Sequence, residues 1–301
     1  MRCIYIVSLL AISIVLPAVL HAEERLPAAF IRIPESVQSI FVAQTNTAEF
    51  HRFDRSADLL VHQGTYYMSI GQAGAGKQRA GDRRTPLGVY FVTERLDTSR
   101  LHEKYGVMAF PLDYPNAWDR RAKRSGDGIW VHGVDANGGE RPALDTDGCV
   151  ALRNEDLTAL APSFSENVTP VIVARDLTWS SAEENIELRL ELEAAVAAWV
   201  DSVSSADLHA YLSIYDDEFQ RWGLNKAQWS AVSVQAIASQ PVHEQSMSDL
   251  LLLRYPEEEG VYLSRFHLQR ATDDRMVETT KRLYWRRNAQ GALRIIAEDD
   301  G

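Results

Sequence analysis

The chain has 301 residues, of which 46% are hydrophobic and 24% are charged, as is ordinary for a globular protein. At this length two domains are expected, because a single core usually stops growing at about 250–300 residues. The formal net charge of −11 argues against a protein that binds along a nucleic-acid backbone, since such a protein needs a positive surface.

The first segment has the pattern of a secretory signal peptide. Arg2 precedes an apolar run from Ile4 to Leu20, and Pro17 followed by Leu20-His21-Ala22 resembles the helix break and small-residue exit of such a signal. We therefore expect residues 1–22 to be cleaved after Ala22 and the protein to be periplasmic or otherwise exported. An uncleaved membrane anchor is the alternative, because the run approaches the lower length limit for a membrane span.

The chain contains two cysteines, Cys3 and Cys149. Cleavage of the signal peptide would remove Cys3 and leave one thiol in an oxidising compartment. A lone cysteine there is either buried and inert or retained for chemistry.

Residues 23–176 are predicted to form a mostly β domain, because short apolar or β-branched runs alternate with turn residues. The predicted strands are Ser39–Gln44 and Glu49–Phe53, which form a hairpin around residues 45–47, together with Thr65–Ile70, Gly88–Thr93, Ile129–His132 and Val168–Ala174. Asn154–Leu160 is the clearest predicted helix of this part.

After a linker at residues 177–186, residues 187–301 are predicted to form an α+β domain. Apolar residues recur at helical spacing between Ala182 and Val203, which indicates an amphipathic helix. Asp207–Phe219 and Lys226–Ser239 are also predicted to be helical. Period-two patterns then predict two antiparallel hairpins, made of Asp249–Tyr255, Val261–Gln269, Thr279–Arg287 and Ala292–Ala297. The aromatic residues of this half either line a pocket or form a packed core; they are Trp199, Tyr211, Tyr215, Trp222, Trp229 and Trp285.

His132 and Cys149 form a candidate catalytic pair. His132 ends a short apolar strand and is followed by Gly133, whereas Cys149 follows Gly148 in a turn. A thiol is nucleophilic as the thiolate, and a neighbouring imidazole can take its proton and hold it as an ion pair. The N–H groups of Gly148 and Cys149 are candidate donors to an oxyanion. Residue types alone leave this as a candidate, because a His and a Cys occur together by chance.

His132-Gly133 followed by Thr146-x-Gly148-Cys149 resembles the signature of the YkuD-type L,D-transpeptidases. The stretches 81–90, 109–116 and 128–130 are similar to this family as well, and the resemblance covers roughly residues 39–175. It implies a β-sandwich or barrel-like catalytic domain with short helices. Residues from about 187 resemble the cone-shaped NTF2-like domains that some cell-shape-determining members of the family carry.

The resemblance implies acyl transfer on peptidoglycan stem peptides, with Cys149 attacking the meso-diaminopimelate–D-Ala bond and His132 moving the proton. It requires no metal or organic cofactor. Thr146 is expected to orient the imidazole or the loop. Candidate substrate contacts are Arg153, Gly133 and Asp147, and a protein partner or further substrate contact is expected on the C-terminal domain.

Two positions depart from the commonest family pattern. Asp147 stands where many members have His, and Ala151 stands where many have Arg, with Arg153 two positions later. The departure at Ala151 puts the usual contact with a substrate carboxylate in doubt. In this respect the chain resembles a branch of the family that includes enzymes hydrolysing L,D bonds. The alternatives are therefore an L,D-carboxypeptidase that trims tetrapeptides to tripeptides and a non-catalytic wall-binding module.

Overall fold

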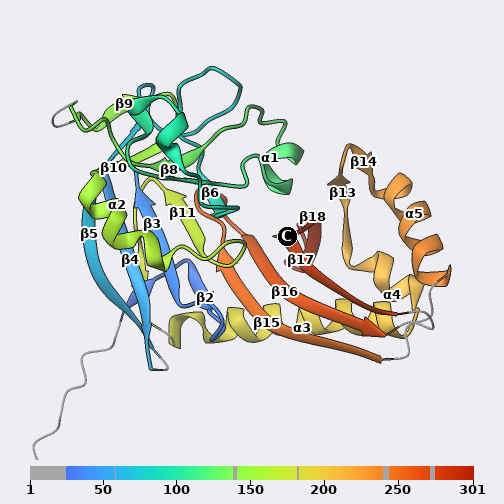
Figure 1. Cartoon of the computed structure of the whole chain (residues 1–301). Coiled ribbons are helices and arrows are strands. Elements are labelled where there is room, and N and C mark those ends of the chain that lie inside the picture. The colour runs from blue at the N-terminus through green and yellow to red at the C-terminus, as the bar shows by residue number, and fades with distance from the viewer. Residues whose placement is uncertain (1–24, 58, 138–140, 182, 240–243, 272–274) are drawn as a thin grey trace, which may run out of the picture.

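The computed structural model describes residues 25–301 except 58, 138–140, 182, 240–243 and 272–274. The predicted signal peptide, its cleavage site and Cys3 lie outside the described residues. Two large curved sheets, each with its own helices, and one two-stranded sheet make up the described part of the protein (Figure 1). Among the described helices, none combines the length and apolar character needed to cross a membrane.

The first sheet has nine strands and carries Cys149 and His132. Its strand order is β6-β11-β3-β4-β5-β10-β8-β7, with β9 paired to β5. The strands are β3 (Ser39–Gln44), β4 (Glu49–Ser56), β5 (Leu59–Gly71), β6 (Gly88–Phe91), β7 (Ala109–Pro111), β8 (Trp130–His132), β9 (Leu144–Thr146), β10 (Val150–Leu152) and β11 (Pro170–Ala174). The predicted hairpin is confirmed as β3 and β4, which pair antiparallel from Ser39 opposite Asp54 to Gln44 opposite Glu49.

Short helices accompany this sheet, as expected. They are α1 (Ala117–Arg121), α2 (Asn154–Leu160) and the 3-10 turns η1 (Thr98–Arg100), η2 (Glu103–Tyr105) and η3 (Ala161–Ser163). The bounds of α2 are those predicted. The helix buries Leu157 and Leu160 in the same core cluster as the apolar side of β10.

The second sheet has seven strands in the order β14-β13-β18-β17-β16-β15-β2. Its strands are β2 (Phe30–Arg32), β13 (Tyr215–Arg221), β14 (Leu224–Asn225), β15 (Glu244–Arg254), β16 (Val261–Ala271), β17 (Met276–Arg287) and β18 (Leu293–Asp300). Its helices are η4 (Glu183–Asn185), α3 (Ile186–Ser204), α4 (Leu208–Ser213) and α5 (Lys226–Ser239). The predicted hairpins are confirmed as β15–β16 and β17–β18.

The prediction of one helix over Asp207–Phe219 is wrong in its second half, because α4 ends at Ser213 and β13 begins at Tyr215. The cause is the spacing of Tyr211, Tyr215 and Phe219, which recur every four residues and all lie buried. This spacing is typical of one helix face. A strand also places residues four apart on one face, because side chains alternate along it, so Tyr215 and Phe219 of β13 both reach the core.

The aromatic residues of the C-terminal half mostly pack into a core. Trp199, Tyr211, Tyr215 and Trp285 are buried in one cluster, and Trp229 packs against it. Of the six aromatic residues, Trp222 is the exposed one.

The two sheets are joined by elements that cross between them. β2 precedes the first sheet in the chain but pairs with β15 of the second. β1 (Leu26–Pro27) pairs with β12 (Trp179–Ser180). One buried cluster contains Ile40 and Val89 from the first sheet together with Leu263 from the second. In Figure 1, α1 projects from the first sheet toward β18, and the side chain of Asn116, just before α1, donates to the Tyr255 hydroxyl at 2.9 Å.

Candidate active site

His132 and Cys149 lie on neighbouring parallel strands. His132 is the last residue of β8 and Cys149 directly precedes β10, with Val150 opposite Val131 and Ala151 opposite His132. Val131 and Val150 point into the hydrophobic core. Because side chains alternate along a strand, Cys149 and His132 share the opposite face.

Strand geometry sets the separation of the pair. Neighbouring strands lie about 4.8 Å apart and each residue rises about 3.3 Å, so two residues of stagger place the two Cα atoms roughly 8 Å apart. Two side chains pointing from one face can meet across that distance. The pair predicted from the sequence is therefore brought to one place.

The Cys149 thiol is buried between backbone groups of the adjacent strand. Its Sγ donates to the Gly128 carbonyl at 3.4 Å, and the Trp130 N–H donates to the sulfur. Burial raises the pKa of Cys149 to about 11, although the Trp130 amide and the charge of Lys104 oppose the shift. At neutral pH the resting thiol is therefore protonated.

His132 is held in one orientation and one tautomer. Its Nδ1 lies 2.6 Å from the Gly133 carbonyl, which can only accept, so Nδ1 carries the proton and Nε2 is left as the base. The Tyr105 ring packs edge-on against the imidazole at 5.2 Å. The pKa of His132 is lowered to about 4, chiefly by burial; the hydrogen bond with Gly133 opposes the shift, and the charges of Arg141 and Lys104 contribute to it.

The resting pair is thus a neutral thiol beside a neutral imidazole, and the expected ion pair is not the resting state. The sequence pattern does not reveal this, because the desolvation of both groups comes from the surrounding fold. The arrangement suits general-base catalysis, in which His132 takes the proton as the sulfur attacks.

This protonation state predicts that the thiolate of Cys149 is absent at pH 7. The ultraviolet difference absorbance of thiolate, wild type minus C149S, is expected to stay near zero at pH 5–8 and to rise only toward pH 11. The sign follows from burial, which penalises the charged form. A thiolate signal at neutral pH would contradict the neutral pair.

The turn before Cys149 is organised by Thr146 and Gly148. The Thr146 hydroxyl accepts from the Gly148 N–H at 3.1 Å and donates to the Cys149 carbonyl at 2.7 Å. Thr146 therefore orients the loop, and the Gly148 amide is already engaged. Gly148 has φ +132°, and a Cβ there would lie 2.8 Å from the Arg84 carbonyl. This position needs glycine on both grounds.

Asp147 reaches an ion pair that the sequence did not suggest. Its exposed carboxylate lies 3.3 Å from the Lys104 ammonium, and Lys104 belongs to η2, which also supplies Tyr105. Lys104 and Tyr105 thus lie beside Cys149 and His132, respectively. No spacing in the sequence links them to either residue, because η2 is placed by tertiary contacts.

Asn154 links the segment after η2 to the segment after β8 through hydrogen bonds. Its Oδ1 accepts from the N–H of Val107 at 3.3 Å and of Val134 at 3.0 Å, while its Nδ2 donates to the Val134 carbonyl at 2.7 Å. A Cβ on Gly106 or Gly133 would lie within 2.3 Å of Asn154 Oδ1. Gly133 therefore allows Asn154 to approach, and its carbonyl also holds His132.

Replacing Asn154 with alanine is expected to destabilise the fold by about 2–3 kcal/mol, because three hydrogen bonds of roughly 1 kcal/mol each are lost. Activity should fall as well, since Tyr105 loses its anchor against His132. Urea unfolding and turnover of N154A measure the two effects. N137A, which changes an exposed asparagine of the same domain, is the control. Equal behaviour of the two variants would contradict the role of Asn154.

A hollow of about 530 Å³ opens over Ala151, the residue paired with His132, on the face of the sheet that carries both. Tyr67, Ala151, Arg141 and Arg153 are among its lining residues. Arg153 pairs with Glu155 at 3.1 Å and Asp156 at 2.7 Å, at the start of α2. The charge of Arg141, which lines the same hollow, lowers the pKa of His132.

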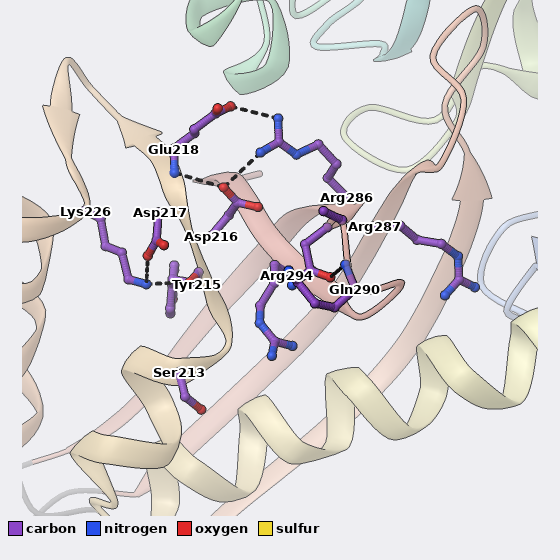
Figure 2. A pocket seen from close by; sticks show the side chains of 12 residues that line it. Ser213, Tyr215, Asp216, Asp217, Glu218, Lys226, Arg286, Arg287, Gln290 and Arg294 are labelled. Atoms are coloured by element: carbon purple, nitrogen blue, oxygen red, sulfur yellow. Dashed lines mark hydrogen bonds and ion pairs between the residues drawn. The ribbon is translucent and has the colours of Figure 1, made fainter.

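A second hollow of about 530 Å³ lies in the C-terminal domain and contains both signs of charge. Figure 2 shows Arg286 between Asp216 and Glu218, at 2.9 and 2.8 Å, and Lys226 on Asp217 at 2.9 Å. Tyr215 is the one aromatic residue of the predicted set that lines it. In the part of the chain that the structure describes, no group of three or more His, Cys, Asp or Glu side chains is placed to hold a metal ion.

The chain combines two domain families. Residues 44–173 match the YkuD L,D-transpeptidase catalytic domain, and residues 191–299 match the Cds6 C-terminal NTF2-like domain. The protein therefore carries a YkuD-family L,D-transpeptidase catalytic domain followed by an NTF2-like domain, which confirms both resemblances. Members of the YkuD family are cysteine-dependent enzymes that act on peptidoglycan peptides.

Two solved structures share both domains in the same arrangement. Bd1075 from Bdellovibrio bacteriovorus has a TM-score of 0.73 at 23% identity, covering 92% of this chain and 98% of that chain. The helical cell shape determining protein Pgp2 from Campylobacter jejuni has a TM-score of 0.73 at 23% identity, covering 87% and 91%. At this identity the similarity shows a common fold. No curated protein matches the chain by sequence.

Proposed function

We propose that the protein is a peptidoglycan L,D-transpeptidase that forms a thioester on Cys149 at the meso-diaminopimelate–D-Ala bond of stem peptides. The observation that carries the proposal is the placement of Cys149 and His132 on one face of adjacent strands, with Nε2 of His132 free of the Gly133 bond. This pairing supplies the nucleophile and base that acyl transfer needs.

The proposed reaction begins with attack of Cys149 Sγ on the carbonyl carbon of the L-centre, as the thiol proton passes to His132 Nε2. The Cys149 N–H is the amide of the turn that receives the negative charge, since the Gly148 N–H is bound by Thr146. The intermediate then expels D-alanine, whose amine takes the proton from His132. An acceptor amine next attacks the thioester carbonyl while it passes a proton to His132. The imidazolium then protonates the departing Cys149 sulfur, so that an amide bond forms, the C–S bond breaks and the thiol is regenerated.

Hydrolysis of the same thioester is the second candidate, and it makes the protein an L,D-carboxypeptidase. Ala151 supports hydrolysis, because the absence of arginine at this position resembles a branch of the family that includes hydrolysing enzymes. Incubation of the purified protein with disaccharide tetrapeptide, followed by mass spectrometry, separates the two. Cross-linked dimer supports the transpeptidase, tripeptide without dimer supports the carboxypeptidase, and unchanged tetrapeptide contradicts both.

We also propose that the protein works outside the cytoplasm, where its substrate lies, after cleavage behind Ala22. Sequencing of the mature amino terminus tests this.

For the C-terminal domain we propose contact with the substrate or with a protein partner. The hollow of Figure 2 supports this proposal, because its charges of both signs suit a ligand that carries positive and negative groups.

A further inference from the structure

The hollow over Ala151 is continuous with the catalytic row of the sheet. Ala151 is paired with Ser69 on one side and with His132 on the other, so these three residues form one row across β5, β10 and β8. Ser69 and Ala151 line the hollow, and the flanking residues of the strands point into the core. A group bound in this hollow therefore lies over Ala151, the residue paired with His132 in the sheet.

The central residue of this row is Ala151, whose side chain is a single methyl group. Ala151 leaves the hollow open at the position where many family members have arginine. The strand itself thus offers no cation beside His132, and a cation has to come from another element if the site is to hold an anion.

Arg141, which precedes β9 and lines the hollow, supplies that cation. The Tyr67 hydroxyl donates to the Arg141 carbonyl at 2.9 Å, and the Ser69 hydroxyl donates to the Pro142 carbonyl at 2.8 Å. The backbone is thereby fixed to β5, directly above the row. The Arg141 side chain is 19% exposed, and its charge acts on His132.

The guanidinium of Arg141 retains donors for a ligand. Asp145 accepts from Nε, and among the residues that the structure describes no acceptor lies within hydrogen-bond distance of the two terminal nitrogens. A guanidinium with both terminal nitrogens available suits bidentate binding of a carboxylate. Arg153, by contrast, is 60% exposed and is paired with Asp156 and Glu155.

We infer that Arg141 binds the terminal carboxylate of the leaving D-amino acid and so selects stem peptides with a free C-terminus. This inference rests on the proposed function and names the substrate group that the site reads. The leaving amine takes its proton from His132, and the carboxylate of the same residue is only two bonds from that nitrogen. A carboxylate receptor for this group therefore has to lie beside His132, which is where Arg141 stands.

Two peptides test the inference: a stem tetrapeptide with a free terminal carboxylate and the same peptide with a terminal amide. Wild type should prefer the acid. R141Q should lower kcat/KM for the acid by about 10- to 100-fold, the worth of a charge-assisted hydrogen-bond pair, with little change for the amide. R141K keeps the charge but not the planar guanidinium that binds a carboxylate through two nitrogens. Its kcat/KM for the acid should therefore lie between those of wild type and R141Q. R95Q, which changes an exposed arginine of the same domain, should behave as wild type.

Thermal unfolding of each variant shows that it is folded. Equal loss on acid and amide, or no loss on either, would overturn the inference while leaving the proposed function intact. Failure of the proposed function would appear in the wild type itself, as cleavage of neither peptide, and would overturn the inference with it.

Discussion

C149A is expected to abolish processing of stem peptides, with a loss of about 10⁴-fold or more, because the acyl intermediate of the proposed reaction forms on the Cys149 sulfur. The fold should persist. The thiol contributes one weak hydrogen bond to Gly128, so the free energy of unfolding should change by about 1 kcal/mol at most. Product formation by mass spectrometry and urea unfolding measure the two quantities.

C149S is the matched control for C149A. Serine keeps the size and the hydrogen bond to Gly128, but its hydroxyl is a far weaker nucleophile than a thiol beside a neutral imidazole. Both variants should therefore be inactive while both are folded. Activity retained in C149A would rule out an acyl-enzyme on Cys149. A cellular phenotype left unchanged by C149A would favour a non-catalytic wall-binding module.

H132N should lower kcat by about 10²- to 10⁴-fold, the usual contribution of a general base. The substitution separates two roles of the histidine. The asparagine Nδ2 can still donate to the Gly133 carbonyl, as Nδ1 does at 2.6 Å, but nothing replaces Nε2. The loss should consequently appear in kcat with a fold that stays intact.

H132A provides the comparison, because it removes both roles. It should be less stable than H132N, since the buried Gly133 carbonyl loses its donor. Added imidazole should restore part of the activity of H132A, because removal of the His132 ring leaves space for it. Turnover by H132N within a few-fold of wild type would show that the proton moves by another route.

Much of the fold could be predicted because its signals are local. The β3–β4 hairpin and α2 follow from short apolar patterns and their turns, and both were predicted nearly to the residue. The strand β13 was missed because its aromatic spacing is that of a helix. β2 was missed because a three-residue strand has a partner more than 200 positions away, which no local pattern indicates.

The proposed catalytic pair could be singled out from the sequence because His132 and Cys149 lie in a characteristic motif. Their protonation could not, because it depends on burial by the whole domain. Lys104, Arg141 and Asn154 escaped for a related reason. Each comes from a turn or helix end whose place is fixed by contacts with distant strands, so its proximity to His132 and Cys149 has no counterpart in sequence spacing.

The crossing of β2 into the second sheet ties the stability of the two halves together. Without this strand, β15 would present unpaired amide and carbonyl groups along part of its edge, and an open edge invites pairing with other chains. The buried cluster shared by the two sheets would also lose one of its sides. The C-terminal half is therefore no detachable module, and the two halves are expected to unfold as a single cooperative unit.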